Sequence, residues 1–183
     1  MATRADRIWT VADLTTAAVS LTAQNAHGRV DSNDEDAVMD GFARAATLAV
    51  EKYTQRLLVR REAVLRLPCL PAGRAPVDLP GGVVGSVTSM TVDGVTFTAF
   101  EIIGNAPAML VPTQEWPVAV GEGYPVSITY QCGPVTVPAD LAVAVKMMAS
   151  EMFERRANSS EVALMTVPLS AQALMAPHRI FPK

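Results

Sequence analysis

The chain has 183 residues, half of them hydrophobic and only 18% charged, with a formal net charge of −3. This length and apolar content can supply the core of one compact domain, or of a domain with a sizeable insertion. The charge leaves no basic excess for gripping phosphates, which argues against a nucleic-acid-binding protein. Aromatic residues make up 5% of the chain, so the core must depend on Val, Leu, Ala and some of the nine Met residues.

The N-terminal sequence superficially resembles a targeting segment. Arg4 and Arg7 precede an apolar stretch over residues 8–23, but Asp13 and several Thr and Ser residues interrupt that stretch. We therefore expect no secretion signal. No apolar run approaches the roughly 20 residues that a membrane-spanning helix needs, so no membrane association is expected.

Residues 10–22 are predicted to form a first helix, because Val11, Leu14, Ala18 and Leu21 recur at helical spacing after a capping Thr. Residues 25–33 are then expected to form a loop.

A second helix follows, capped by Ser32 or Asn33, with three acidic residues in its first turn and basic residues further along. This order of charges complements the helix dipole. Its predicted buried stripe consists of Val38, Phe42, Ala45, Ala49 and Tyr53.

From residue 57 to 133 the helical period disappears and Pro and Gly become frequent. Asp93-Gly94 predicts a type I′ hairpin within residues 90–97, with Met90 and Val92 on its apolar side and Thr91 facing Thr96 on the other. Further strands are predicted at Val77 and Leu79, over residues 108–111 and over residues 126–132, with the sheets half-covered by the core.

A late helix is predicted to begin at residues 137–140, where Pro138 can occupy the first helical position. Its buried stripe should be Leu141, Val145, Met148 and Met152, and Glu151 can pair with Arg155 one turn on. The helix should end near Asn158. A short helix capped by Ser170 should run to Ala176, where Pro177 stops it.

These elements predict an α+β fold, in which a helical bundle core carries an inserted antiparallel β-rich subdomain and a C-terminal arm. The expected parts are an N-terminal helical part (residues 1–57), the β-rich insertion (58–135), a C-terminal helix packing on the N-terminal helices (136–158) and the arm (159–183).

No catalytic motif is recognisable, so neither enzyme activity nor a cofactor is expected. The Gly-rich residues 80–85 lack the Lys-Ser/Thr of a phosphate loop, and His178 has no evident partner in the sequence. Cys69 and Cys132 have no metal-ligand spacing to either His, so we expect two reduced thiols and no metal site. Trp116 is interpreted as core or interface packing, with a ligand platform as the alternative.

Several short motifs follow one another in an informative order. Residues 53–56 (Tyr-Thr-Gln-Arg) end the second helix, residues 77–87 enter a strand after Leu-Pro, and residues 126–133 form a strand that ends in Cys-Gly. Residues 137–141 open the late helix, and residues 173–179 close the sequence of motifs. In this order the chain resembles the head–tail connector (adaptor) family of tailed bacteriophages, in the branch with a β-rich insertion.

The resemblance covers residues 12–179, with three departures from the family's pattern: Gln55 stands where the family has Gly, Cys132 where it has Ala, and His178 where it has Tyr. The resemblance implies a homo-oligomeric ring, typically of twelve subunits, in the neck of the virion between the portal protein and a stopper or tail-completion protein. DNA would pass through the channel without specific binding. Assembly would take place in the bacterial host cytoplasm.

Two other interpretations remain open from the sequence. The same adaptor could serve a gene transfer agent or a defective prophage particle. A small-ligand or carbohydrate-binding β module with helical flanks is the alternative from another class, although its usual exposed aromatic cluster has few candidates here beyond Trp9 and Trp116.

Residues 168–183 are predicted to be a portal-docking arm. They follow a loop rich in Ser and Asn, carry an apolar patch, and add two cations suited to an acidic partner. The alternative is that this tail folds back on its own subunit. The residues assigned to docking are Leu169, Leu174, Met175, Pro177, His178, Arg179, Ile180 and Phe181.

Overall fold

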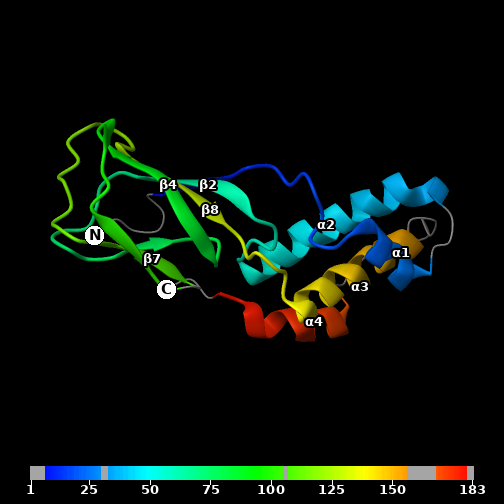
Figure 1. Ribbon diagram of the computed structural model, residues 1–183. Coiled ribbons are helices and arrows are strands. Elements are labelled where there is room, and N and C mark those ends of the chain that lie inside the picture. Colours follow the sequence, from blue (N-terminus) through cyan, green and yellow to red (C-terminus); the bar gives the residue numbers. More distant parts are fainter. Residues whose placement is uncertain (1–6, 30–32, 105–106, 156–167, 181–183) are drawn as a thin grey trace. The chain divides into compact units, whose positions relative to one another are not determined.

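The structure is a computed structural model that describes residues 7–29, 33–104, 107–155 and 168–180 (Figure 1). The chain divides into two compact units. A β-rich unit consists of Met1–Asp13 and Arg60–Pro134, and a helical unit consists of Leu14–Val59 and Val135–Lys183. Helices and antiparallel sheets occur together, which confirms the predicted α+β class.

The larger sheet of the β-rich unit has five strands, and each neighbouring pair is antiparallel. Along the sheet the order is β1 (Ile8–Val11), β2 (Arg61–Leu67), β8 (Val126–Cys132), β4 (Val84–Val92) and β5 (Val95–Thr96).

Strand β8 lies in the middle of this sheet and shows why its sequence forms a strand. Its side chains alternate between fully buried and half-buried positions, and Val126, Ile128, Tyr130 and Cys132 are all 0% exposed. This alternation places one face of the strand on the core. The strand predicted over residues 126–132 is therefore confirmed.

The predicted hairpin is also confirmed. Asp93 and Gly94 adopt φ angles of 52° and 79°, as a type I′ turn requires, and Thr91 pairs with Thr96. Met90 and Val92 are buried as expected, but Val95 is 71% exposed because β5 is a two-residue strand at the sheet edge.

A second, three-stranded antiparallel sheet has the order β3 (Val77–Leu79), β7 (Ala108–Pro112) and β6 (Phe100–Ile103). The predicted strands at residues 77–79 and 108–111 are confirmed. In both strands buried residues alternate with more exposed ones, which places one face of the sheet on a core. The buried residues include Val77, Leu79, Ala108 and Leu110.

The first predicted helix, over residues 10–22, is wrong. Residues 8–11 form β1, which pairs with β2, because Ile, Trp, Thr and Val favour an extended strand over a helix. The helix α1 begins only at Leu21 and runs to Gly28, so it also replaces the first four residues of the predicted loop over residues 25–33. Ser20 is its cap, since its hydroxyl accepts a hydrogen bond from the Ala23 N–H.

The second predicted helix is present as α2 (Asp36–Thr54), preceded by a 3₁₀ turn over Asn33–Glu35. The predicted cap at Ser32 lies outside the described residues. The predicted stripe is wrong by about one residue of rotation: the buried hydrophobic residues are Met39, Ala43, Ala46 and Val50. Small Ala side chains let neighbouring helices approach, and Met39 is the long side chain among them. Of the predicted stripe, Phe42, Ala49 and Tyr53 are half-buried, and Val38 and Ala45 are exposed.

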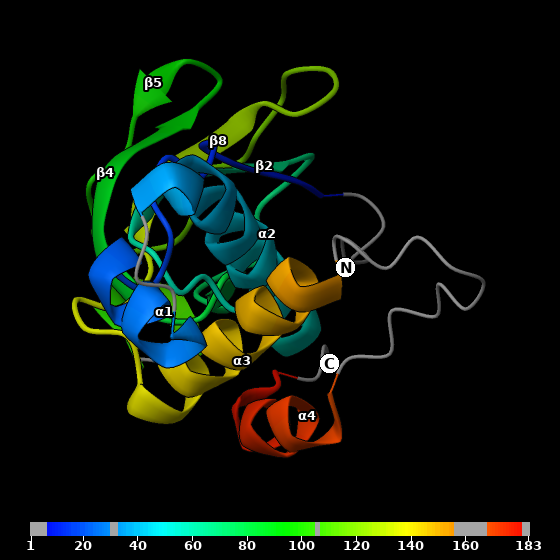
Figure 2. The same cartoon turned by 90° about the vertical axis from the view of Figure 1, so that its right-hand side faces the viewer.

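The late helix α3 (Ala139–Arg155) packs along α2 (Figure 2). Leu141, Val145 and Met148 are buried as predicted, whereas Met152 is half-buried. The predicted pair of Glu151 and Arg155 is confirmed, with 2.5 Å between Oε1 and Nη2. The predicted end of the helix near Asn158 lies outside the described residues.

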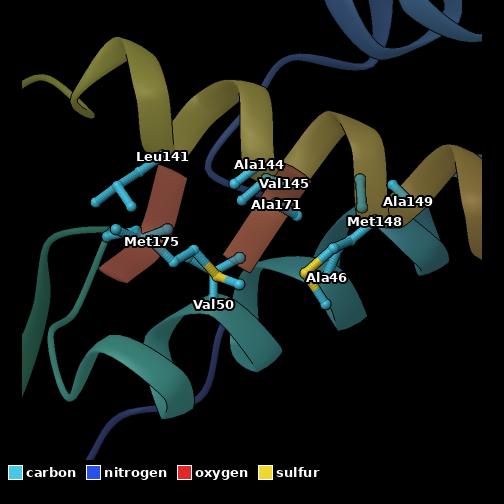
Figure 3. Close-up of a cluster of buried hydrophobic side chains, with 11 residues drawn as sticks. Ala46, Val50, Leu141, Ala144, Val145, Met148, Ala149, Ala171 and Met175 are labelled. Carbon is cyan, nitrogen blue, oxygen red and sulfur yellow. The ribbon is translucent and has the colours of Figure 1, made fainter. Parts of the chain in front are cut away.

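The last helix, α4, comprises Leu169–Met175 and continues into a 3₁₀ turn over Ala176–His178. The short helix predicted here is present, but Ser170 lies inside it, and Pro168 occupies the cap position without a side-chain hydrogen bond. Figure 3 shows α4 in contact with the core that α2 and α3 share. The buried members of this core are Ala43, Ala46, Val50, Leu58, Leu141, Ala144, Val145, Met148, Ala149, Ala171 and Met175.

Candidate functional site: the C-terminal segment on the helical unit

The C-terminal segment is held on its own subunit by helix α4. Ala171 and Met175 are 0% exposed, and Met175 lies in the same buried cluster as Val50 and Leu141 (Figure 3). Burying a side chain of this size stabilises a fold by about 1.5–3 kcal/mol. Met175 is therefore core, and for this residue the structure shows the back-folded alternative, not a free arm.

Three further contacts hold the chain after α4. The His178 imidazole and the Asp140 carboxylate, at the start of α3, form an ion pair or hydrogen bond. The Arg179 guanidinium lies 5.4 Å from the centre of the Tyr53 ring, in a cation–π arrangement. The Ile180 N–H donates to the Thr54 carbonyl at 2.9 Å. The segment is thus fixed to both α2 and α3.

The contact with His178 has an electrostatic consequence for Asp140. The hydrogen bond from His178 stabilises the carboxylate and lowers the pKa of Asp140 below its ordinary value. Burial opposes this shift and the Leu141 N–H supports it. Asp140 is therefore an ionised partner for His178 at neutral pH, a pairing that the sequence did not reveal because 38 residues separate the two.

The contacts of Arg179 and Ile180 join two motifs that are far apart in sequence. Residues 53–56 and 173–179 are the first and last of the motifs that carry the adaptor resemblance, and in the structure Arg179 of the last motif lies over Tyr53 of the first, while the next residue, Ile180, bonds to Thr54. The motif at the end of α2 therefore forms the support for the tail.

Gln55, within that motif, has a left-handed backbone with φ 57° at the end of α2. Glycine adopts this conformation without the steric cost that a Cβ introduces. Glycine is also the residue that the adaptor family's pattern has at this position. The Gln55 side-chain amide donates to the Lys52 carbonyl at 2.8 Å and partly compensates that cost.

A buried carboxylate, which sequence analysis missed, supports the chain after this turn. Glu51 is 7% exposed, and its Oε1 accepts hydrogen bonds from the N–H groups of Leu58 at 2.7 Å and Val59 at 3.4 Å. A glutamate that begins the final turn of a helix and is followed by a left-handed residue could have signalled this role.

The other residues assigned to docking differ in exposure. Leu169 is 83% exposed, and Pro177 and Arg179 are also exposed. Leu174 and Ile180 are half-buried, and Phe181 lies outside the described residues. Among the residues assigned to docking, those that a partner could reach are therefore Leu169, Pro177 and Arg179.

The β-rich unit presents a loop that is fixed by Asp93 in the hairpin turn. The Asp93 carboxylate accepts hydrogen bonds from the N–H groups of Val120 at 2.9 Å and Gly121 at 2.8 Å. The backbone N–H of Asp93 donates to the Pro125 carbonyl at 2.9 Å. Val118 and Val120 are nevertheless each 83% exposed. The turn that the sequence predicts thus also anchors a second loop.

Both tryptophans make contacts within the β-rich unit. Trp116 is 6% exposed, its Nε1 donates to the Ala75 carbonyl at 2.8 Å, and its ring centre lies 5.6 Å from that of Phe97. This confirms the packing interpretation of Trp116. Trp9 donates to the Tyr130 hydroxyl at 2.8 Å, and that hydroxyl donates to the Pro80 carbonyl at 2.9 Å.

Over the part of the chain that the structure describes, no three His, Cys, Asp or Glu side chains gather in a way that could hold a metal ion. Cys132 is buried and Cys69 exposed, and both are free thiols. Within the same residues, none of the helices combines the length and the apolar character that crossing a membrane requires.

The fold has clear counterparts among solved structures, although no protein-family model and no curated protein matches the sequence. One counterpart is a chain in the neck of an empty gene transfer agent (GTA) particle, computed with C6 symmetry. It has a TM-score of 0.73 and 22% identity over 96% of this chain and 97% of the other.

Two further matches come from native GTA particles. A chain of the virion gives a TM-score of 0.72 at 22% identity, and a chain of the neck, computed with C12 symmetry, gives 0.67 at 23% identity. Each match covers 95% of this chain and 97% of the other. At these identities the similarity establishes a shared fold across both units.

Proposed function

We propose that this chain is a structural head–tail connector (adaptor) subunit in the neck of a phage-like particle, and that it catalyses no reaction. The observation that carries the proposal is the match to GTA neck chains over nearly the full length of both proteins. The order of sequence motifs supports the same function, and two of those motifs meet where the tail is held.

In this proposal the subunits form a homo-oligomeric ring of about twelve copies around a DNA channel. The necks to which the fold is similar were computed with C6 and C12 symmetry, which supports a ring for this chain too. The net charge of −3 suits a channel that DNA crosses without being held.

The portal protein would bind on one side of the ring and a stopper or tail-completion protein on the other. We place the portal contact on the exposed part of the C-terminal segment, at Leu169, Pro177 and Arg179. The rest of α4 would position this surface, since its inner side is part of the helical core. An apolar patch beside a cation suits a partner surface that is apolar and acidic.

Deletion of the coding sequence in the host that produces the particles tests this function. We expect filled heads and free tails that do not join, with joining restored by the wild-type gene in trans. Cryo-electron microscopy of complemented particles should place this chain between portal and tail. Normal joining in the deletion strain, together with absence of the protein from purified particles, would contradict the proposal. Gene order around the locus would separate a phage from a GTA or a defective prophage.

A further inference from the structure

Helix α2 has a second apolar face that the subunit leaves exposed. Val38, Gly41, Ala45 and Leu48 follow one another at spacings of three and four residues, so they form one line along the helix. Val38 is 44% exposed and Leu48 is 48% exposed, although the inner face of the same helix is fully buried. We call these four residues the outer stripe. A helix that is apolar on two opposite faces is normally covered on both.

Gly41 is the second observation. Glycine weakens a helix relative to alanine because it has more conformational freedom to lose. A Cβ built at Gly41 would meet no atom within 4 Å, so nothing in the described part of the subunit requires glycine there. A missing Cβ does let another backbone approach closely. Gly41 therefore fits a helix that packs on the outer stripe from outside the subunit.

The charges and the length of α2 indicate which helix this is. Helix α2 has 19 residues, with Asp36 in its first turn and Lys52 in its last turn. Helix α3 has 17 residues, with Asp140 in its first turn and Arg155 in its last turn. If α3 of another copy lies antiparallel on α2, each acidic end meets a basic end along a nearly equal length.

The same helix also has an apolar side chain to offer. Val143 of α3 is 36% exposed, away from the buried Ala144 and Val145. Within one subunit α2 and α3 run antiparallel, since Phe42 near the start of α2 contacts Phe153 near the end of α3. A small rotation from one copy to the next in a ring keeps this antiparallel direction between α2 of one copy and α3 of its neighbour.

We infer that the outer stripe of α2 is the surface through which one copy of this chain packs on the next, and that α3 of the second copy, around Val143, occupies it. The inference rests on the ring proposed above and specifies its interface. Two different surfaces meet in such a contact, so it is heterologous and can close into a ring.

Analytical ultracentrifugation of the full chain tests the stripe. The wild type should self-associate with a dissociation constant of about 1 mM or lower. Leu48→Arg and Gly41→Leu should each raise that dissociation constant by about tenfold or more. Val118→Arg is the matched control, because it also replaces an exposed apolar residue by a cation, and it should associate like wild type. Circular dichroism checks that every variant stays folded. A wild type that remains monomeric, or stripe variants that associate normally, would overturn the inference.

Cross-linking tests the occupant. In a Cys69→Ser background, which removes the exposed native thiol, Ala45→Cys and Val143→Cys chains are purified with different tags, mixed and treated with a short bis-maleimide. We expect cross-linked pairs that carry both tags. Pairs formed by Ala45→Cys chains alone would show α2 on α2 and overturn the assigned occupant. A ring in cryo-electron microscopy whose subunits do not cross-link would overturn this interface while leaving the proposed function intact; absence of the chain from particles would overturn the proposed function.

Discussion

Replacing Met175 by Ala measures directly whether the C-terminal segment belongs to the core. Met175 is 0% exposed and packs in the cluster that α2 and α3 share, so the substitution removes most of a buried side chain and leaves a cavity. Such Met→Ala changes cost about 2–5 kcal/mol. Leu169→Ala is the matched control in the same helix, because Leu169 is 83% exposed and the change should stay within about 0.5 kcal/mol.

Urea unfolding can assign the loss to the helical unit. Far-UV circular dichroism follows the helices, whereas both tryptophans, Trp9 and Trp116, lie in the β-rich unit and report on it by fluorescence. With a slope of about 2 kcal/mol per molar urea, a loss of 2 kcal/mol moves the circular dichroism midpoint down by about 1 M. If Met175→Ala and Leu169→Ala unfold at the same midpoint as wild type, α4 is not part of the core and the back-folded arrangement is wrong.

Three further predictions concern other parts of the chain. Gln55→Gly should stabilise the protein by about 0.5–1 kcal/mol in thermal or urea unfolding, because glycine relieves the left-handed strain; Gln55→Ala, which keeps the Cβ and loses the hydrogen bond to Lys52, should give no gain. Burial raises the pKa of Tyr130 above its ordinary value in the folded protein. The contribution of Tyr130 to stability is therefore complete below about pH 10. Above that pH the unfolded chain loses the phenol proton more readily, so the free energy of unfolding falls by about 1.4 kcal/mol per pH unit until the folded pKa is reached. Tyr130→Phe should therefore be less stable than wild type at pH 8 by about 1–3 kcal/mol, since Trp9 and Pro80 lose their partner, yet show a shallower loss between pH 10 and 11 in urea unfolding. Duplex DNA should not bind at submicromolar protein even at low salt, and tight binding that added salt abolishes would contradict an inert channel.

The sequence predicted those elements whose signals are local. The Asp93-Gly94 turn requires positive φ angles that few other residue pairs supply, so the hairpin and its register followed from two residues. The regular alternation in residues 126–132 and the helical period in residues 139–155 were equally direct.

The errors occurred where tertiary pairing overrode a local pattern. Residues 10–22 have helical spacing of apolar residues, yet Ile8–Val11 form a strand because β2 offers an edge more than 50 residues away. In α2 the predicted stripe selected the larger side chains, whereas the core uses the Ala-rich line beside them. A helix with apolar residues on two sides cannot be oriented from its own period, since the period does not say which side meets its own subunit.

The C-terminal segment shows the same difficulty as α2, because apolar residues on more than one side of a helix do not indicate which side is buried. The sequence predicted that the apolar residues of 168–183 form one docking patch, with folding back on their own subunit as the alternative, but the seven-residue helix α4 divides them: Met175 faces the core and Leu169 faces outward. A seven-residue helix is not stable alone in water, so it forms only where a surface holds it. Such a surface is present, because the residues that follow α4 are bound to α2 and α3. These contacts join His178 to Asp140, Arg179 to Tyr53 and Ile180 to Thr54. A portal contact at Leu169 would then be made by a segment already fixed in place, so binding would lose less conformational freedom than docking of a free arm.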